Sequence, residues 1–98
     1  MGYRIVFHPE AQGDIDALEG RLRTLVGKKL LQIAQNPAIG KPLGNVAGTA
    51  LAGYLKTSVD DRRVRIVYCT DGGKLIVTVV AVGKREDMLV YKIAASRL

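Results

Sequence analysis

The sequence predicts a small α+β fold with the element order β-α-α-β-β-β-α, in which a helical hairpin covers one face of a mostly antiparallel sheet. Three observations carry this prediction: an alternating apolar run opens the chain, helical periodicity follows, and β-rich runs joined by turns come last. Helices and strands are thus segregated along the chain, as in α+β proteins. The 98 residues have room for one hydrophobic core, so we expect a single domain over 1–98.

The first half of the chain predicts one strand and two helices. Residues 3–7 alternate between polar and apolar side chains, which is typical of a half-buried strand. Pro9 and the acidic residues that follow it are typical of a helix start, and Gly20 ends that first helix. A second amphipathic period runs over about 21–35 and stops at Asn36–Pro37. Two helices joined at Gly20 predict an antiparallel helical hairpin.

The second half predicts a loop, three strands and a short helix. Residues 37–53 are rich in glycine and proline, so we expect a loop lying over the core. Residues 54–59 form the next predicted strand, and Asp60–Asp61 form a turn. The β-rich runs within 62–82, joined at Asp71–Gly73, predict a hairpin. Apolar residues after Glu86 predict a terminal helix.

Composition narrows the functional classes. An apolar fraction of 48% supports a packed core, and a net charge of +6 favours nucleic acid or an acidic protein as partner. No apolar run approaches the ~20 residues of a membrane span, and residues 1–9 lack the apolar region of a signal peptide. We therefore expect a cytoplasmic protein without a membrane partner. The single cysteine, Cys69, fits a reducing compartment.

Basic side chains are the best candidates for chemistry. One histidine, His8, and one cysteine make no zinc-ligand set, so we expect no metal and no cofactor. Arg63 and Arg65 lie two positions apart on a predicted strand and therefore share one face, opposite the apolar side chains that face the helices. Arg85 at the end of the next strand and the phenol of Tyr91 complete a cluster able to bind phosphate and stack on a base. A solvated sheet face carrying rim charges is the alternative.

At these residues the chain resembles the RelE/ParE superfamily of bacterial type II toxins over nearly its whole length. Each matching segment is short, but their order and spacing together are specific to the family. The segments are Tyr3–Pro9, the hairpin ending at Asn36–Pro37, Gly40–Leu43, Arg65–Tyr68, Val82–Glu86, Val90–Tyr91 and Ala95–Arg97. The resemblance implies a RelE-like fold, in agreement with the element order above.

The RelE branch resembles this chain best, and its members cut ribosome-bound mRNA without a metal. The resemblance implies that Arg65 holds the phosphate and that Arg85 stabilises charge in the transition state. It implies that Tyr91 stacks on a base and that Lys56 is a candidate general base. We expect three further basic residues to contact substrate, namely Arg62, Arg63 and Lys84. The expected partners are the ribosome with its mRNA and an acidic cognate antitoxin.

Two other functions stay open on the sequence. The same fold serves ParE-like inhibitors of DNA gyrase, which are not ribonucleases. A catalytically silent, partner-binding member is the second alternative. This alternative is favoured by three positions at which the RelE branch usually carries basic residues. In this chain they are Tyr54, Thr57 and Ser58.

Overall fold

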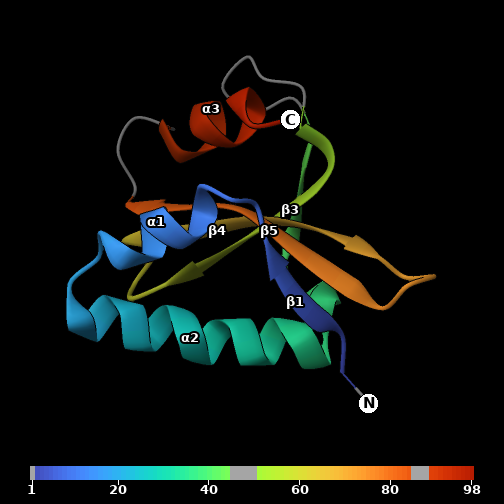
Figure 1. Cartoon of the computed structure of the whole chain (residues 1–98), viewed down its shortest axis with the longest axis horizontal. Coiled ribbons are helices and arrows are strands. Elements are labelled where there is room, and N and C mark those ends of the chain that lie inside the picture. Colours follow the sequence, from blue (N-terminus) through green and yellow to red (C-terminus); the bar gives the residue numbers. More distant parts are fainter. Residues whose placement is uncertain (1, 45–50, 85–88) are drawn as a thin grey trace.

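The computed structural model describes residues 2–44, 51–84 and 89–98. Their elements confirm the predicted α+β class and add one strand to the predicted order (Figure 1). The elements are β1 (Arg4–Phe7), α1 (Ala11–Asp16), α2 (Gly20–Gln35), the 3₁₀ turn η1 (Pro37–Ile39), β2 (Lys41–Gly44), β3 (Leu51–Val59), β4 (Val64–Asp71), β5 (Ile76–Lys84) and α3 (Leu89–Ser96).

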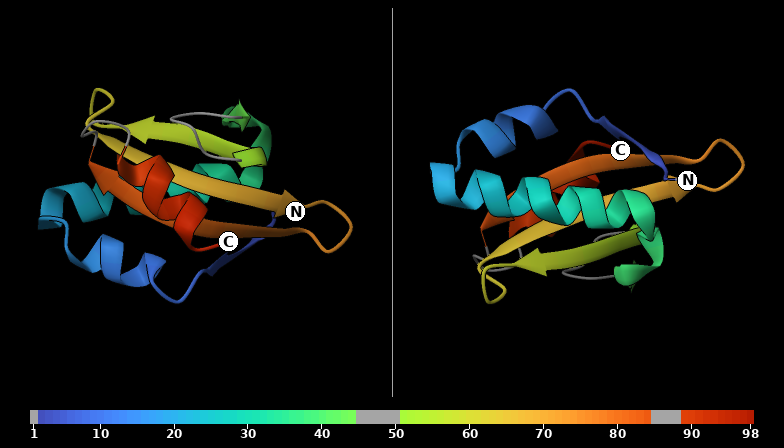
Figure 2. Two further views of the ribbon diagram at one scale, coloured as in Figure 1. Left: turned by 90° about the horizontal axis from the view of Figure 1, so that it is seen from above. Right: turned by 90° about the horizontal axis from the view of Figure 1, so that it is seen from below.

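The strands form one five-stranded sheet in the order β1-β5-β4-β3-β2. Neighbouring strands are antiparallel except for β1, which runs parallel to β5. Figure 1 shows α2 below the sheet and α3 above it, and the two views of Figure 2 show each helix lying across the strands. The described part of the chain is therefore layered, with a helix on each face of the sheet.

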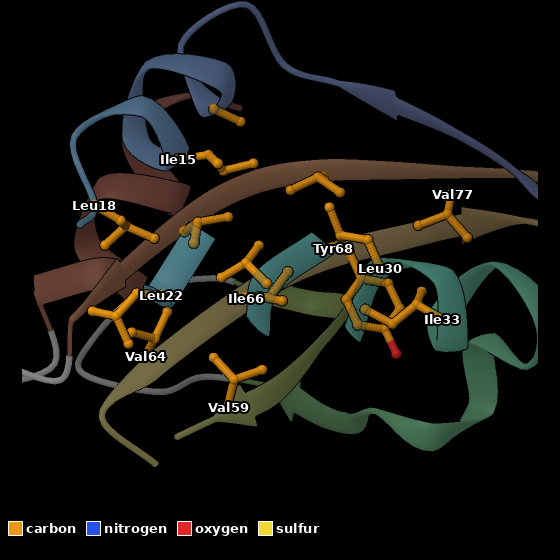
Figure 3. Close-up of a cluster of buried hydrophobic side chains, with 14 residues drawn as sticks. Ile15, Leu18, Leu22, Leu30, Ile33, Val59, Val64, Ile66, Tyr68 and Val77 are labelled. Carbon is orange, nitrogen blue, oxygen red and sulfur yellow. The ribbon is translucent and has the colours of Figure 1, made fainter. Parts of the chain in front are cut away.

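The larger core lies between α2 and the sheet (Figure 3). Leu22, Val26, Leu30 and Ile33 recur at helical spacing along α2 and are all buried. They pack against alternate side chains of β4, which are Val64, Ile66 and Tyr68. The predicted orientation of Val64 and Ile66 toward the helices is confirmed. None of the described helices is both long enough and apolar enough to cross a membrane.

A smaller core lies under α3 and depends on a β-bulge. The register between β4 and β5 shifts where Val67 pairs with Ala81 but Tyr68 pairs with Val79, so Val80 is the extra residue. Val80 and Ala81 consequently both face α3, although they are adjacent in sequence. They form the second apolar cluster with Leu51, Val67, Val90, Tyr91 and Ala94. The bulge thus creates the apolar surface on which α3 rests.

The loop predicted over 37–53 is wrong in part. Lys41–Gly44 form the edge strand β2, which pairs with β3, and β3 begins at Leu51 rather than at Tyr54. Glycine and proline disfavour strands in general, but an edge strand tolerates Pro42 because it pairs on one side only.

The two helices of the predicted hairpin contact different parts of the sheet. β1 ends opposite Val79, and α1 lies beside the part of β5 that continues beyond it. There the Asp14 carboxylate accepts a hydrogen bond from the Val82 backbone N–H at 3.0 Å. Thus α2 covers the face of the sheet, while α1 caps an edge of β5 that β1 leaves unpaired.

Candidate functional site

Arg65 and Tyr91 form the centre of the candidate site. Arg65 Nη1, on β4, donates a hydrogen bond to the Tyr91 hydroxyl on α3, and the guanidinium carbon lies 5.7 Å from the ring centroid. Arg65 Nε is buried and has no partner among the described residues. Because a guanidinium carries five N–H donors in a planar fork, Arg65 keeps hydrogen-bonding capacity for an anion.

Lys56 reaches the same centre from β3. Its Nζ lies 5.8 Å from the centroid of the Tyr91 ring, close enough for a cation–π contact. Leu55, its neighbour in sequence, packs into the core on the α2 side, so strand alternation directs Lys56 to the α3 side. Three predicted site residues from three different elements are therefore brought together.

Tyr91 differs from its expected environment. Its side chain is fully buried, packed in the cluster beneath α3 with Val67 and Val80. The expected stacking of this ring on a base requires an exposed ring face, and the structure offers none. In this conformation the phenol orients the Arg65 guanidinium instead.

An open pocket of about 330 Å³ adjoins Arg65 and Lys56. Two further basic residues, Lys41 and Arg62, line it together with hydroxyl groups and one apolar side chain. No carboxylate belongs to this lining among the described residues, so the pocket concentrates positive charge and N–H and O–H donors. The full lining is Ile39, Lys41, Lys56, Thr57, Ser58, Arg62 and Arg65. We call it the basic pocket.

An unusual turn places Arg62 at the basic pocket. Asp60, Asp61 and Arg62 have positive φ angles of 54°, 54° and 70°, in the left-handed region that is costly for residues with a Cβ. The Arg21 guanidinium on α2 holds this turn through two hydrogen bonds to the Asp60 carboxylate, at 3.0 and 2.9 Å. These hydrogen bonds also hold the pKa of the Asp60 carboxyl below its ordinary value.

Arg63 and Lys84 do not line the basic pocket. The expectation that Arg63 shares a strand face with Arg65 is wrong, because β4 begins at Val64 and Arg63 belongs to the turn. Arg63 and Lys84 line a neighbouring pocket, together with Arg62. This pocket also contains three acidic side chains, Glu19, Asp60 and Asp61. This second pocket is mixed in charge and therefore less suited to an anion. Arg85 lies outside the described residues.

Comparison with known protein families identifies the family of this chain. The model of the ParE toxin of type II toxin–antitoxin systems, parDE, matches residues 5–89. The chain belongs to the RelE/ParE superfamily of type II toxins. This confirms the family that the sequence motifs indicate.

Relatives of this RelE/ParE toxin include both curated proteins and solved structures. A putative RelE-like toxin protein of Escherichia coli is 32% identical over 98 residues, which cover 100% of this chain and 99% of the relative. A mutant of the E. coli toxin RelE in the free state has a TM-score of 0.79 at 27% identity, over 100% of this chain and 99% of that one. The RelBE2 toxin–antitoxin complex from Mycobacterium tuberculosis has a TM-score of 0.74 at 24% identity, over 87% and 100%, and shows the fold alone.

Two features of this RelE/ParE toxin were missed at the sequence level. Lys41 lies in the segment expected to be a loop, and only its pairing in β2 places it opposite Lys56 at the basic pocket. The ion pair between Asp14 and Arg97 ties the end of α3 to α1. Residues 83 positions apart give no local signal of contact. In the described part of the chain, no three His, Cys, Asp or Glu side chains cluster as metal ligands would.

Proposed function

We propose that this RelE/ParE toxin is a ribosome-dependent mRNA endoribonuclease of the RelE type. The observation that carries the proposal is the convergence of Arg65, Lys56 and Tyr91 beside the basic pocket. Such a site offers charge-assisted donors to a phosphodiester and a lysine near the reacting atoms. The RelE-like name of the curated relative and the likeness to solved RelE structures support the same assignment.

In the proposed reaction the substrate supplies its own nucleophile. The 2′-hydroxyl oxygen attacks the adjacent phosphorus, and its proton passes to the amine of Lys56, which must be unprotonated when it acts as the base. The bond from phosphorus to the 5′-oxygen of the next nucleotide breaks, and that leaving oxygen takes up a proton from water. Arg65 holds the non-bridging oxygens, oriented by its hydrogen bond to Tyr91. Arg85 keeps the role that the resemblance implies, stabilising the charge that develops on the phosphoryl oxygens. The products are a 2′,3′-cyclic phosphate and a 5′-hydroxyl.

End-group analysis on programmed ribosomes tests this mechanism. Translated mRNA should be cut and free RNA left largely intact, because such a small site depends on the ribosome to position its substrate. The 5′ fragment should end in a 2′,3′-cyclic or 3′-phosphate, and a 2′-deoxy nucleotide at the cut site should abolish cleavage. A free 3′-hydroxyl on the 5′ fragment would show that water is the nucleophile, and the mechanism would be wrong.

The proposed partner is an acidic antitoxin. Structural relatives are described in complex with antitoxins, among them the intact E. coli RelBE complex, with a TM-score of 0.68 at 26% identity. With a net charge of +6, this chain should attract an acidic segment that folds on binding. Association rates measured at low and high salt should then differ strongly, while dissociation rates change little. Equal association rates would remove the electrostatic part of the proposal.

Inhibition of DNA gyrase is the second candidate function. The observation that favours it is the match of residues 5–89 to the ParE family model. Supercoiling by purified gyrase separates the two candidates, since the RelE-type proposal expects no effect of the toxin on supercoiling. Loss of supercoiling without any mRNA cleavage would replace the first proposal with the second.

A further inference from the structure

The basic pocket contains an unfavourable arrangement of charge. Lys41 on β2 lies directly opposite Lys56 on β3 in the antiparallel register, so both side chains are on the same face of the sheet. Like charges directly opposite each other on paired strands destabilise a sheet. A bound anion between or beside the two ammonium groups removes that cost, and both side chains line the basic pocket.

Of the four basic side chains that line the basic pocket, Arg62 lies in the turn between β3 and β4, and the other three lie on neighbouring strands. From the edge inward they are Lys41 on β2, Lys56 on β3 and Arg65 on β4. Neighbouring strands are about 4.8 Å apart, and Arg65 lies two residues along β4 from Val67, the residue paired with Lys56, so the backbones of Lys41 and Arg65 are separated by about 12 Å. One phosphate held by Arg65 leaves Lys41 available for a second negative charge. In a nucleic-acid strand that second charge recurs at the next nucleotide.

We propose that Lys41 binds the phosphate next to the one held by Arg65, so that single-stranded RNA crosses the sheet from β4 toward β2. This inference deepens the proposed ribonuclease function and rests on it for the identity of the reacting phosphate. Lys41 is a substrate-positioning residue in this scheme, because it contacts a phosphate that does not react. Ile39 is 38% exposed and lines the same pocket, where it offers an apolar surface to the ribose or base between the two phosphates.

The first experiment combines a protein change with a substrate change. Cleavage on programmed ribosomes is measured for the wild type, for Lys41→Gln and for Lys28→Gln, which removes the same charge from the exposed side of α2. Lys41→Gln should raise KM by about fivefold with kcat nearly unchanged, as expected for the loss of an exposed ion pair. Lys28→Gln should change neither.

The substrate change locates the contact. A neutral methylphosphonate is placed at the phosphate on either side of the scissile one. At one of these two positions it should raise KM for the wild type and for Lys28→Gln, but cause no further increase for Lys41→Gln. Additive effects at both positions would overturn the inference, and Lys41 would then serve only to protect an edge strand from pairing.

A binding experiment separates this inference from the proposed function. Affinity for a single-stranded 2′-deoxy oligonucleotide, which cannot be cut through a 2′-hydroxyl, is measured against salt concentration. The logarithm of the association constant falls as the logarithm of the salt concentration rises. Lys41→Gln should make this negative slope shallower by about 0.7, and Lys28→Gln should leave it unchanged. That result together with absent cleavage would remove the ribonuclease proposal and leave the Lys41 contact standing. An unchanged slope with weaker binding of a glutamate-rich peptide would assign Lys41 to a protein partner and overturn the inference.

Discussion

Arg97 donates hydrogen bonds to both carboxylate oxygens of Asp14, at 2.6 and 3.0 Å. Arg97 Nη1 also donates to the backbone carbonyl of Val80, the extra residue of the β-bulge, at 2.9 Å. The Asp14 carboxylate in turn accepts from the Val82 N–H. One ion pair therefore joins α1, the end of α3 and the irregular part of β5, and it fixes the helix that carries Tyr91.

Asp14→Ala tests how much this ion pair stabilises the folded chain. Removing the carboxylate leaves the Arg97 guanidinium, 10% exposed, with only the exposed Glu10 carboxylate, 3.5 Å from its Nε, as an ionic partner, and leaves the Val82 N–H without an acceptor. We expect a loss of about 2–3 kcal/mol in the free energy of unfolding, measured in urea, because breaking a largely buried charged pair is costly. Asp16→Ala is the matched control, since Asp16 is exposed on the same helix and should cost less than about 0.5 kcal/mol. Equal losses of unfolding free energy for Asp14→Ala and Asp16→Ala would show that the ion pair does not stabilise the fold.

Gly40→Ala tests the close packing of the Gly40 backbone against the Tyr68 side chain. A Cβ at this position would lie 2.8 Å from Cζ of Tyr68 and 3.0 Å from the carbonyl oxygen of Lys56. Tyr68 would have to move and lose its 2.6 Å hydrogen bond to the Pro37 carbonyl. We expect a loss of about 2–3 kcal/mol in unfolding free energy.

Two further variants give this test its controls. Gly27→Ala, in α2, meets nothing within 4 Å and should be neutral or stabilising by up to about 1 kcal/mol. In the Tyr68→Phe background Gly40→Ala should cost less, because the phenol oxygen is gone. Full additivity of the two changes would show that they do not act through this contact.

Tyr91→Phe separates packing from hydrogen bonding at the site. The change keeps the buried ring but removes the acceptor for Arg65 Nη1. Under the proposed function the single-turnover cleavage rate should fall by roughly tenfold, less than the ~10²–10³ expected for Arg65→Ala, which removes a donor to the phosphate. Unfolding free energy should fall by only about 1 kcal/mol. A rate loss as large as that of Arg65→Ala would mean that the phenol itself moves a proton.

Arg85→Ala should slow cleavage more than Lys56→Ala does. The role of Arg85 rests on the family resemblance, which implies a contact with charge that develops only in the transition state. Single-turnover rates at saturating toxin on programmed ribosomes compare the two variants directly. If Lys56→Ala proves the more damaging change, the assignment of roles is reversed.

Cys69 should react slowly with alkylating reagents. Burial raises the pKa of its thiol, against a smaller opposing effect of a hydrogen bond with Tyr54. Because only the thiolate reacts, the rate of alkylation by iodoacetamide should rise with pH along a curve displaced to higher pH than for the urea-unfolded chain. Coincident curves for the folded and unfolded chain would contradict this expectation.

Local pattern was enough to predict most of the elements. The alternation at residues 4–7, the helical period of α2 and the β-rich runs of β4 and β5 each lie within one stretch of chain, so their periodicity indicates secondary structure directly. The same alternation placed Val64 and Ile66 on the α2 side and Arg65 on the other. For these residues the sequence determined both the element and the face.

Tertiary structure decided what depends on pairing between distant segments. β2 exists because β3 supplies hydrogen bonds to a stretch whose glycine and proline disfavour a strand, and that pairing brings Lys41 to Lys56. The bulge at Val80 reverses the alternation of β5 and builds the surface on which Tyr91 is buried. Burial leaves the Tyr91 ring without an exposed face, and its hydroxyl accepts a hydrogen bond from Arg65. No local pattern encodes these contacts, because each depends on the register of segments that meet only in the folded chain.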